Sequence, residues 1–118
     1  MIELQEWLKE HGIHYSKTEL KNLEYLYLGN NSLTSIPDSI GELENLSYLD
    51  LRYNNLTSIP NSICNLENLK TLYVNNNNKI TSIHIRLKTF LEKVCWWSWI
   101  NEQNWTNNSV EYICESDI

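Results

Sequence analysis

The sequence predicts an α/β fold, a solenoid in which short parallel strands follow one another along the chain. The first observation is an internal repeat, because residues 23–33 match residues 46–56 at a shift of 23 residues. The second is the alternation of leucines with polar or aromatic residues within each copy, which is typical of half-buried strands. The third is the length of 118 residues, which suffices for one domain with one continuous core.

The chain begins with a predicted helix over residues 2–11. Gly12 directly follows this segment and is suited to end it, because glycine readily adopts a left-handed backbone. Ser16 and Glu19 have the spacing of a capping box, but Leu20 already belongs to the repeat, so a second helix there would be brief. One face of the first helix carries three apolar residues, Leu4, Trp7 and Leu8.

Each repeat contributes one predicted strand, and equal repeat length predicts that the strands stack in parallel. The rest of each coil also supplies inward apolar residues, so every coil adds a layer to a continuous core. In the first coil these residues are Leu23, Leu33, Ile36, Ile40 and Leu43. The inward strand residues of the three copies are Leu26 and Leu28, Leu49 and Leu51, and Leu72 and Val74.

Polar and proline residues also recur with the repeat. Three asparagines lie where the chain leaves each strand, at positions where a buried amide can bond to turn backbone. We interpret them as a stacked structural ladder: Asn31, Asn54 and Asn77. Pro37 and Pro60 lack a backbone donor and suit segments outside the sheet. A short turn or helical piece is expected over residues 38–41.

The regular pattern ends in the third copy. One extra residue falls within residues 75–79, where we expect a bulged loop. His84 occupies the position of the prolines and is assigned to a loop. Four apolar residues then recur at helical spacing, namely Leu87, Phe90, Leu91 and Val94.

A tryptophan-rich segment follows, over residues 95–100 and Trp105. We interpret it as cover for the open end of the core, since stacked repeats need a cap. An exposed docking patch, which would make a weak homodimer, is the second interpretation. A membrane anchor is the third, and the surrounding glutamates disfavour it. Residues 95–100 are expected to form a last strand, with 110–114 as a further strand or tail.

The repeat has the pattern L-x-x-L-x-L-x-x-N-x-L and resembles the leucine-rich-repeat family, especially its bacterial and plant intracellular type with the extension L-T-S-I-P. The resemblance covers Leu20 to about Ile83. It implies a right-handed solenoid with a short parallel sheet on its concave face. We expect one domain over residues 1–118, with an N-terminal cap at 1–19, repeats at 20–83 and a C-terminal cap at 84–118.

The strand residues between the inward leucines are expected to face the concave surface. Tyrosine combines a broad apolar ring with a polar tip, and arginine adds forked hydrogen bonding, so both suit a protein-binding surface. Tyrosines also simply favour strands, but that preference does not explain the accompanying aspartate and arginine. The candidate partner-binding residues are Tyr25, Tyr27, Tyr48, Asp50, Arg52, Tyr53, Tyr73 and Asn75.

Composition excludes several classes of partner. The net charge of −6 disfavours nucleic acid and anionic membrane surfaces. The start of the chain has no signal-peptide pattern and no apolar stretch is long enough to span a bilayer, so we expect a cytoplasmic protein. The three cysteines, Cys64, Cys95 and Cys114, fit neither a disulfide framework nor a metal motif, although a bridge between Cys95 and Cys114 stays open.

Catalysis is not expected. The three histidines, His11, His14 and His84, have no cysteine or serine partner in a known motif, and Cys64 lacks an activating group. We therefore hypothesise a non-catalytic protein-interaction module without a cofactor or metal, present as a monomer or weak homodimer. Two alternatives remain: an inhibitor, immunity or effector protein that blocks one enzyme, and a structural module that self-associates through its tryptophan-rich end.

Overall fold

The computed structural model describes residues 2–74, 76, 77, 80, 82–84 and 111–113. Two helices come first, α1 (Ile2–Glu10) and α2 (Lys17–Lys21). Strands β1 (Tyr25–Tyr27), β2 (Tyr48–Asp50) and β3 (Thr71–Tyr73) follow, separated by the 3-10 helices η1 (Asp38–Glu42) and η2 (Asn61–Asn65). Strands β4 (Ser82–His84) and β5 (Glu111–Ile113) complete the described elements. This content is that of the predicted α/β fold.

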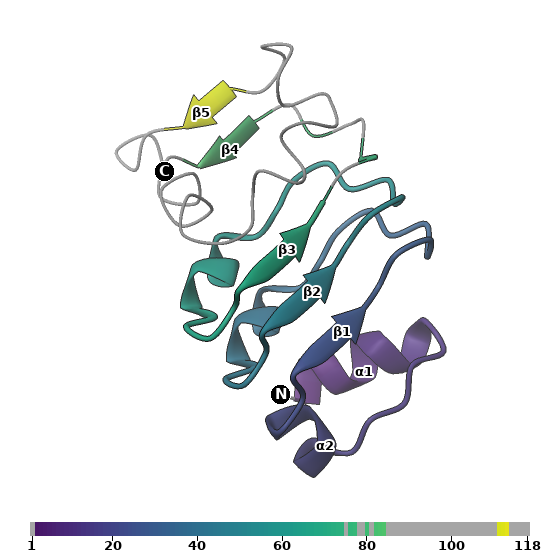
Figure 1. Ribbon diagram of the computed structural model, residues 1–118. Coiled ribbons are helices and arrows are strands. Elements are labelled where there is room, and N and C mark those ends of the chain that lie inside the picture. The colour runs from purple at the N-terminus through teal and green to yellow at the C-terminus, as the bar shows by residue number, and fades with distance from the viewer. Residues whose placement is uncertain (1, 75, 78–79, 81, 85–110, 114–118) are drawn as a thin grey trace.

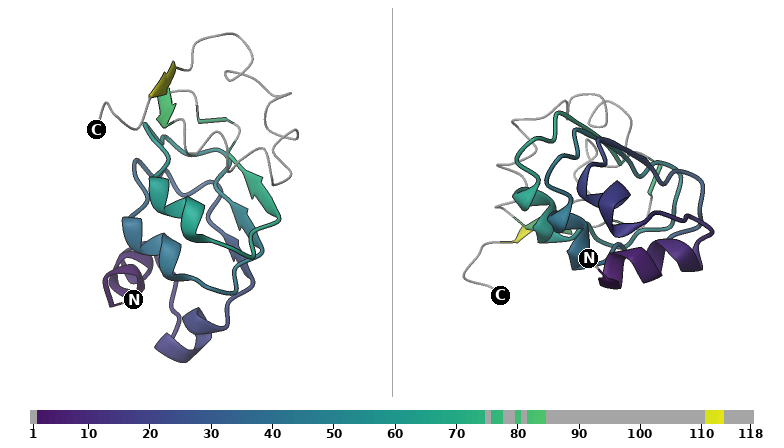
Figure 2. Two further views of the ribbon diagram at one scale, coloured as in Figure 1. Left: turned by 90° about the vertical axis from the view of Figure 1, so that its left-hand side faces the viewer. Right: turned by 90° about the horizontal axis from the view of Figure 1, so that it is seen from below.

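Strands β1, β2 and β3 form one parallel sheet in chain order, with α1 and α2 at its β1 end (Figure 1). The register pairs Leu26 with Leu49 and Leu49 with Leu72, so neighbouring coils are shifted by 23 residues, as the repeat predicts. The two 3-10 helices lie one behind the other across the coils from the sheet (Figure 2). The sequence period therefore fixes the spacing of the coils on both sides.

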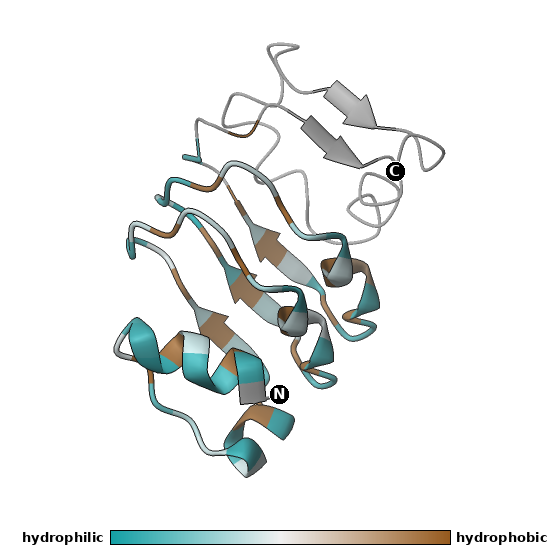
Figure 3. Cartoon of the chain, turned by 180° about the vertical axis from the view of Figure 1, so that it is seen from behind, coloured by the Kyte–Doolittle hydropathy of each residue, from teal (hydrophilic) through white to brown (hydrophobic). Residues whose placement is uncertain are grey.

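The core runs between the sheet and the 3-10 helices, and the centre of each of the three strands is apolar (Figure 3). Leu23, predicted to point inward, is only half-buried, whereas its repeat equivalents Leu46 and Leu69 are buried. Because each coil covers the apolar side of the next, the core is continuous along the stack. Its members include Leu26, Leu28, Leu33, Ile36, Ile40, Leu43, Leu49, Leu51, Leu56, Ile63, Leu66, Leu72 and Val74.

The predicted asparagine ladder is confirmed. The side-chain Nδ2 of Asn54 donates to the carbonyls of Leu28 and Leu51, and its Oδ1 accepts from the backbone N–H of Asn31 and of Leu33. Asn77 repeats this arrangement one coil later, with Nδ2 donating to the carbonyls of the second and third coils and Oδ1 accepting from the second. Each amide thus joins two coils through buried backbone groups.

A second column of asparagines, which the sequence analysis did not identify, precedes the strands. Asn45 Nδ2 donates to the carbonyl of Lys21 at 2.8 Å, and Asn68 Nδ2 donates to the carbonyl of Glu44 at 2.8 Å. The signal was present, because Asn22, Asn45 and Asn68 are each 23 residues apart. Asparagines therefore join the coils at both ends of the strands.

The N-terminal elements form as predicted. Leu4 and Leu8 of α1 are fully buried, and Trp7 packs against the same core. Gly12 has a φ of 78° and follows α1 directly, which agrees with its predicted role as the terminating residue. The capping box is complete, because Ser16 Oγ accepts from the Glu19 N–H while the Glu19 carboxylate accepts from the Ser16 N–H. The helix that it starts, α2, has five residues.

Each proline immediately precedes a 3-10 helix. Pro37 precedes η1 and Pro60 precedes η2, and the carbonyl of each proline accepts the first helical hydrogen bond, from Ile40 and Ile63 respectively. The short helical piece expected after Pro37 is thereby confirmed. Proline suits this place because its fixed φ is compatible with the chain entering a helix and its missing N–H is not needed there.

The extra residue of the third repeat can be located more narrowly. Asn77 keeps the spacing of 23 residues from Asn54, but Ile80, which is buried, lies 24 residues after Leu56. The insertion therefore falls between Asn77 and Ile80. The bulged loop expected there involves residues 75, 78 and 79, which lie outside the described residues.

The assignment of His84 to a loop is wrong, because His84 ends strand β4, which pairs in parallel with β5. The alternating residues around Ile83 continue the extended backbone that Pro37 and Pro60 otherwise interrupt, since histidine retains its donor. Strand β5 falls within 110–114, where a strand or tail was expected. The predicted helix at 87–94, the tryptophan segment, Cys95 and Cys114 lie outside the described residues. Across the described part of the chain, no helix has the length and apolar character needed to cross a membrane.

Candidate interaction surface

Seven of the eight candidate residues lie on β1, β2 and β3 or directly after β2, on the side of the sheet opposite the core. We call this surface the tyrosine face, and its residues are Tyr25, Tyr27, Tyr48, Asp50, Arg52, Tyr53 and Tyr73. The eighth candidate, Asn75, lies outside the described residues. The period of two within the strands explains the arrangement, because alternate residues point to opposite sides of a sheet.

Tyr48 lies at the centre of the aromatic part of this face. Its ring centroid is 6.0 Å from that of Tyr25, 5.2 Å from that of Tyr27 and 5.6 Å from that of Tyr73. These separations are in the range of favourable tilted or edge-to-face aromatic pairs. Four rings from three strands therefore form one continuous aromatic surface, with Tyr48 half-buried beneath its neighbours.

Asp50 and Arg52 form a two-pronged ion pair beside these rings. Arg52 Nε donates to Asp50 Oδ1 at 3.0 Å, and a terminal nitrogen of Arg52 donates to Oδ2 at 2.7 Å. The backbone N–H of Arg52 also donates to Oδ1. The guanidinium lies over the ring of Tyr73, with its carbon 4.5 Å from the ring centroid. Arg52 is thus held in one orientation by a carboxylate and an aromatic ring.

Asp50 is more covered than a residue on an open sheet surface would be. It counts among the buried residues, although the sequence places it between two surface tyrosines. The neighbouring coil has Gly29 at this point, and a side chain there would approach Asp50 Oδ1 to 3.5 Å and the Arg52 carbonyl to 3.2 Å. Glycine therefore leaves space for the carboxylate on one side while Arg52 covers it from another.

The ion pair shifts the pKa values of its members and of Tyr48. Burial acts to raise the pKa of the Asp50 carboxyl, but the hydrogen bonds and charge of Arg52 outweigh it and hold that pKa below its usual value. The hydrogen bond to Asp50 raises the pKa of Arg52. Burial, and then the charge of Asp50, raise the pKa of Tyr48. At neutral pH the pair is therefore ionised and the Tyr48 hydroxyl is neutral.

Tyr53 has an unusual backbone for a bulky side chain. Its φ is 55°, and the residues at the same position of the neighbouring coils, Asn30 and Asn76, have φ values of 58° and 62°. Asparagine is enriched in this left-handed region, whereas a large side chain there is an outlier. The repeat thus imposes a left-handed turn after each strand, and in the second coil a tyrosine occupies it.

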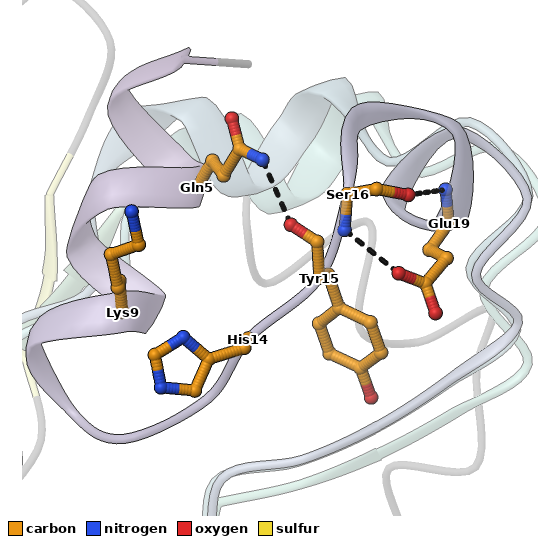
Figure 4. Close-up of a pocket in the computed structure, with 6 residues that line it drawn as sticks. All are labelled: Gln5, Lys9, His14, Tyr15, Ser16 and Glu19. Carbon is orange, nitrogen blue, oxygen red and sulfur yellow. Dashed lines mark hydrogen bonds between the residues drawn. The ribbon is translucent and has the colours of Figure 1, made fainter.

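Two surface hollows lie away from the tyrosine face. One, of about 190 Å³, is lined by Gln5, Lys9, His14, Tyr15, Ser16 and Glu19 (Figure 4). Its polar groups serve local structure, since Gln5 Nε2 donates to the Tyr15 carbonyl and Ser16 and Glu19 form the capping box. The other, of about 510 Å³, follows the second asparagine column and is lined by Asn22, Glu24, Asn45, Ser47, Asn68 and Lys70.

The residues considered for catalysis are dispersed. His11 Nδ1 bonds to the Trp7 carbonyl at 2.9 Å and its ring lies 4.6 Å from the Trp7 ring. His14 lines the hollow of Figure 4, and Cys64 is half-buried in η2. Among the described residues, no three histidine, cysteine or acidic side chains gather in a way that could hold a metal ion.

Comparison with known protein families decides the classification. A family model described as a leucine-rich repeat region matches residues 2–115. The chain belongs to the leucine-rich repeat family. No curated protein matches it. Members of the family are in general non-enzymatic modules that bind other proteins, which makes a surface of this leucine-rich repeat, rather than a catalytic cleft, the relevant site.

The family pattern and the structure divide the residues of this leucine-rich repeat in the same way. The leucines and asparagines that define the family are buried or bonded to backbone, and the tyrosine face is made of the positions that the pattern leaves open. Sequence reasoning identified these open positions from the period of two. It missed the cover over Asp50, because that cover depends on Gly29 of the preceding coil.

Proposed function

We propose that this leucine-rich repeat is a non-catalytic module that binds a partner protein through its tyrosine face. One observation carries the proposal: of the described residues, the large hydrophobic side chains that remain exposed are Tyr25, Tyr27 and Tyr53, at 55%, 63% and 55% exposure, and all three lie on this face. Exposed aromatic side chains that gather on one surface are typical of protein-binding sites.

The chemistry of the face supports the same function. Tyrosine has few rotatable bonds, so a partner can cover its ring at a small cost in side-chain entropy, and its hydroxyl offers a hydrogen bond at the edge. Arg52 is already held by Asp50 and Tyr73, so it too loses little freedom on binding. A rigid aromatic surface with one fixed arginine favours recognition and contains no nucleophile with an activating base.

The architecture that we propose around the face is a single domain over residues 1–118. In it, the coils form a right-handed solenoid with the tyrosine face on the concave side. The helices α1 and α2 cap one end, because Leu4 and Leu8 are buried against the first coil. Residues 84–118 cap the other end. We propose a monomer or weak homodimer that uses no cofactor.

Affinity capture tests the proposed function. The full chain and a variant with Tyr27→Ala, Tyr48→Ala and Tyr73→Ala are used as baits for the same extract, and captured proteins are compared by mass spectrometry. Loss of one specific partner from the triple variant is expected. Because Tyr48 is half-buried, a second variant with only Tyr25→Ala and Tyr27→Ala separates lost binding from lost stability.

A matched control removes two exposed side chains elsewhere. Thr34 and Thr57 occupy equivalent positions of successive coils and are exposed, outside the three strands of the tyrosine face. The Thr34→Ala, Thr57→Ala variant should capture the partner as the unchanged chain does. Equal recovery of a specific partner by both tyrosine variants would place the binding site elsewhere.

A further inference from the structure

The tyrosine face already holds one guanidinium group, that of its own Arg52. Two features hold it: the Asp50 carboxylate, which it meets through two side-chain hydrogen bonds, and the face of the Tyr73 ring at 4.5 Å. Cations are attracted to the faces of aromatic rings, and arginine stacks there more often than lysine. The internal contact therefore shows which chemistry this surface accommodates.

Equivalent ring surface remains uncovered on the other side of Tyr48. Tyr25 and Tyr27 are more than half exposed, and their rings are tilted against Tyr48 at centroid distances of 6.0 and 5.2 Å. Among the described residues, Arg52 is the cation that lies over a ring of this face, and it covers Tyr73. The rings of β1 are thus open to a cation from another molecule.

The charge of the molecule favours such a cation. Residues 2–74 contain ten acidic and five basic side chains, so this part of the chain has a net charge of −5. On the face itself, Asp50 and Arg52 neutralise each other through their ion pair. A basic segment approaching the face is therefore attracted by the whole molecule and meets no unpaired positive charge at the rings.

We infer that the partner of the tyrosine face presents a basic segment, whose arginine side chains stack on the rings of Tyr25 and Tyr27. This inference rests on the proposed function and names the chemistry of the partner. An acidic segment is disfavoured by the net negative charge. A second copy of this chain is disfavoured for the same reason, since both copies have a net charge of −6.

Binding of defined peptides to the full chain tests the inference. The probe is a fluorescein-labelled, end-capped peptide with arginine alternating with glycine and serine. Its matched peptides replace arginine by lysine, by glutamate, or by citrulline, which has the shape of arginine without its charge. Fluorescence anisotropy gives the affinities at low ionic strength. We expect the arginine peptide to bind about tenfold more tightly than the citrulline peptide, with lysine between them and glutamate weakest.

Variants then locate the contact. Tyr25→Ala with Tyr27→Ala should weaken binding of the arginine peptide about tenfold, because both rings are lost. Tyr25→Phe with Tyr27→Phe should retain the wild-type affinity within about twofold, because the rings remain. The Thr34→Ala, Thr57→Ala control should bind as the unchanged chain does. None of these substitutions alters the net charge, so a difference reports the rings rather than the overall field.

Two results would overturn the inference. The first is equal affinity for the arginine and citrulline peptides, or no binding of either, which would mean that the face does not read positive charge. The second is unchanged binding of the arginine peptide by the alanine variant, which would mean that the cation binds elsewhere. In both cases a partner whose capture still depends on Tyr25 and Tyr27 would leave the proposed function standing.

Discussion

Tyr53 combines two properties that rarely coincide in one residue. Its side chain is exposed, and its backbone is in the left-handed region that Asn30 and Asn76 occupy in the neighbouring coils. We expect Tyr53→Asn to stabilise the fold by about 0.5–1 kcal/mol, because asparagine adopts this region at a lower steric cost. Urea unfolding measures the change. Tyr53→Phe, which keeps the bulky side chain, should be neutral, and a destabilised Tyr53→Asn variant would show that the ring contributes to packing.

If Tyr53 contacts the partner, Tyr53→Asn should have opposite effects on stability and binding. Backbone strain retained at one exposed residue is characteristic of functional positions, where a locally unfavourable side chain serves recognition. The prediction is a more stable chain with weaker capture of its partner. Unchanged capture would remove Tyr53 from the binding surface and leave the other tyrosines in place.

The ion pair predicts a pH dependence. The folded-state pKa of Asp50 is lowered, so the stabilisation by its charged form is present above the unfolded pKa of about 4 and is lost as the pH falls below it. At pH 7, Asp50→Asn should cost about 1 kcal/mol, a modest value because the Arg52 side chain is 37% exposed.

Unfolding of both proteins between about pH 3 and pH 7 provides the measurement, since this range spans the titration of Asp50. The stability difference between the wild type and Asp50→Asn should be constant near neutral pH and shrink below about pH 4. A difference that does not depend on pH would show that the Asp50 charge makes no net contribution. Lys70→Gln, an exposed change of charge on β3's approach, should leave the pH profile near that of the wild type.

At the scale of one coil, Asn54 joins elements that no other side chain joins in the same way. Its amide bonds to the buried carbonyls of Leu28 and Leu51 and to the N–H of Leu33. Asn54→Ala should therefore cost about 3–4 kcal/mol, because several buried backbone groups lose their partner. Its exposed neighbour is the control, and Asn55→Ala should cost less than about 0.5 kcal/mol by the same unfolding measurement. Similar costs at both positions would contradict a structural role for the ladder.

The strands and the ladder could be predicted because each depends on a position within the repeat. Leu26, Leu49 and Leu72 pair in the sheet at the spacing that the sequence shows. The second asparagine column has the same spacing and was overlooked, because an exposed amide before a strand carries no apolar signal. His84 was assigned by analogy with the prolines, although histidine retains the N–H that a strand requires.

Features that depend on side chains from two coils could not be predicted in the same way. The cover over Asp50 requires Gly29 in one coil and Arg52 in the next, and its effect appears only when the strands are in register. The stacking of Arg52 on Tyr73 also crosses from β2 to β3. Composition indicated an aromatic surface, but the central place of Tyr48 follows from its neighbours on both sides.

For the whole molecule, the proposed single domain predicts one cooperative unfolding transition. Trp7 lies in α1, and the other four tryptophans lie between residues 96 and 105, so fluorescence reports mainly on the C-terminal part. Far-UV circular dichroism reports on the backbone throughout. The two signals should change together in urea, as expected for a two-state domain. Separate midpoints would divide the chain into two units and contradict the domain over residues 1–118.

Site-specific photocrosslinking tests most directly whether the tyrosine face binds the partner. Benzoylphenylalanine replaces Tyr27 in one protein and Thr57 in another, because both side chains are exposed but only Tyr27 lies on the tyrosine face. With the captured partner present, irradiation should yield a crosslinked product from position 27 and little from position 57. A product from position 57 with none from position 27 would contradict binding through this face.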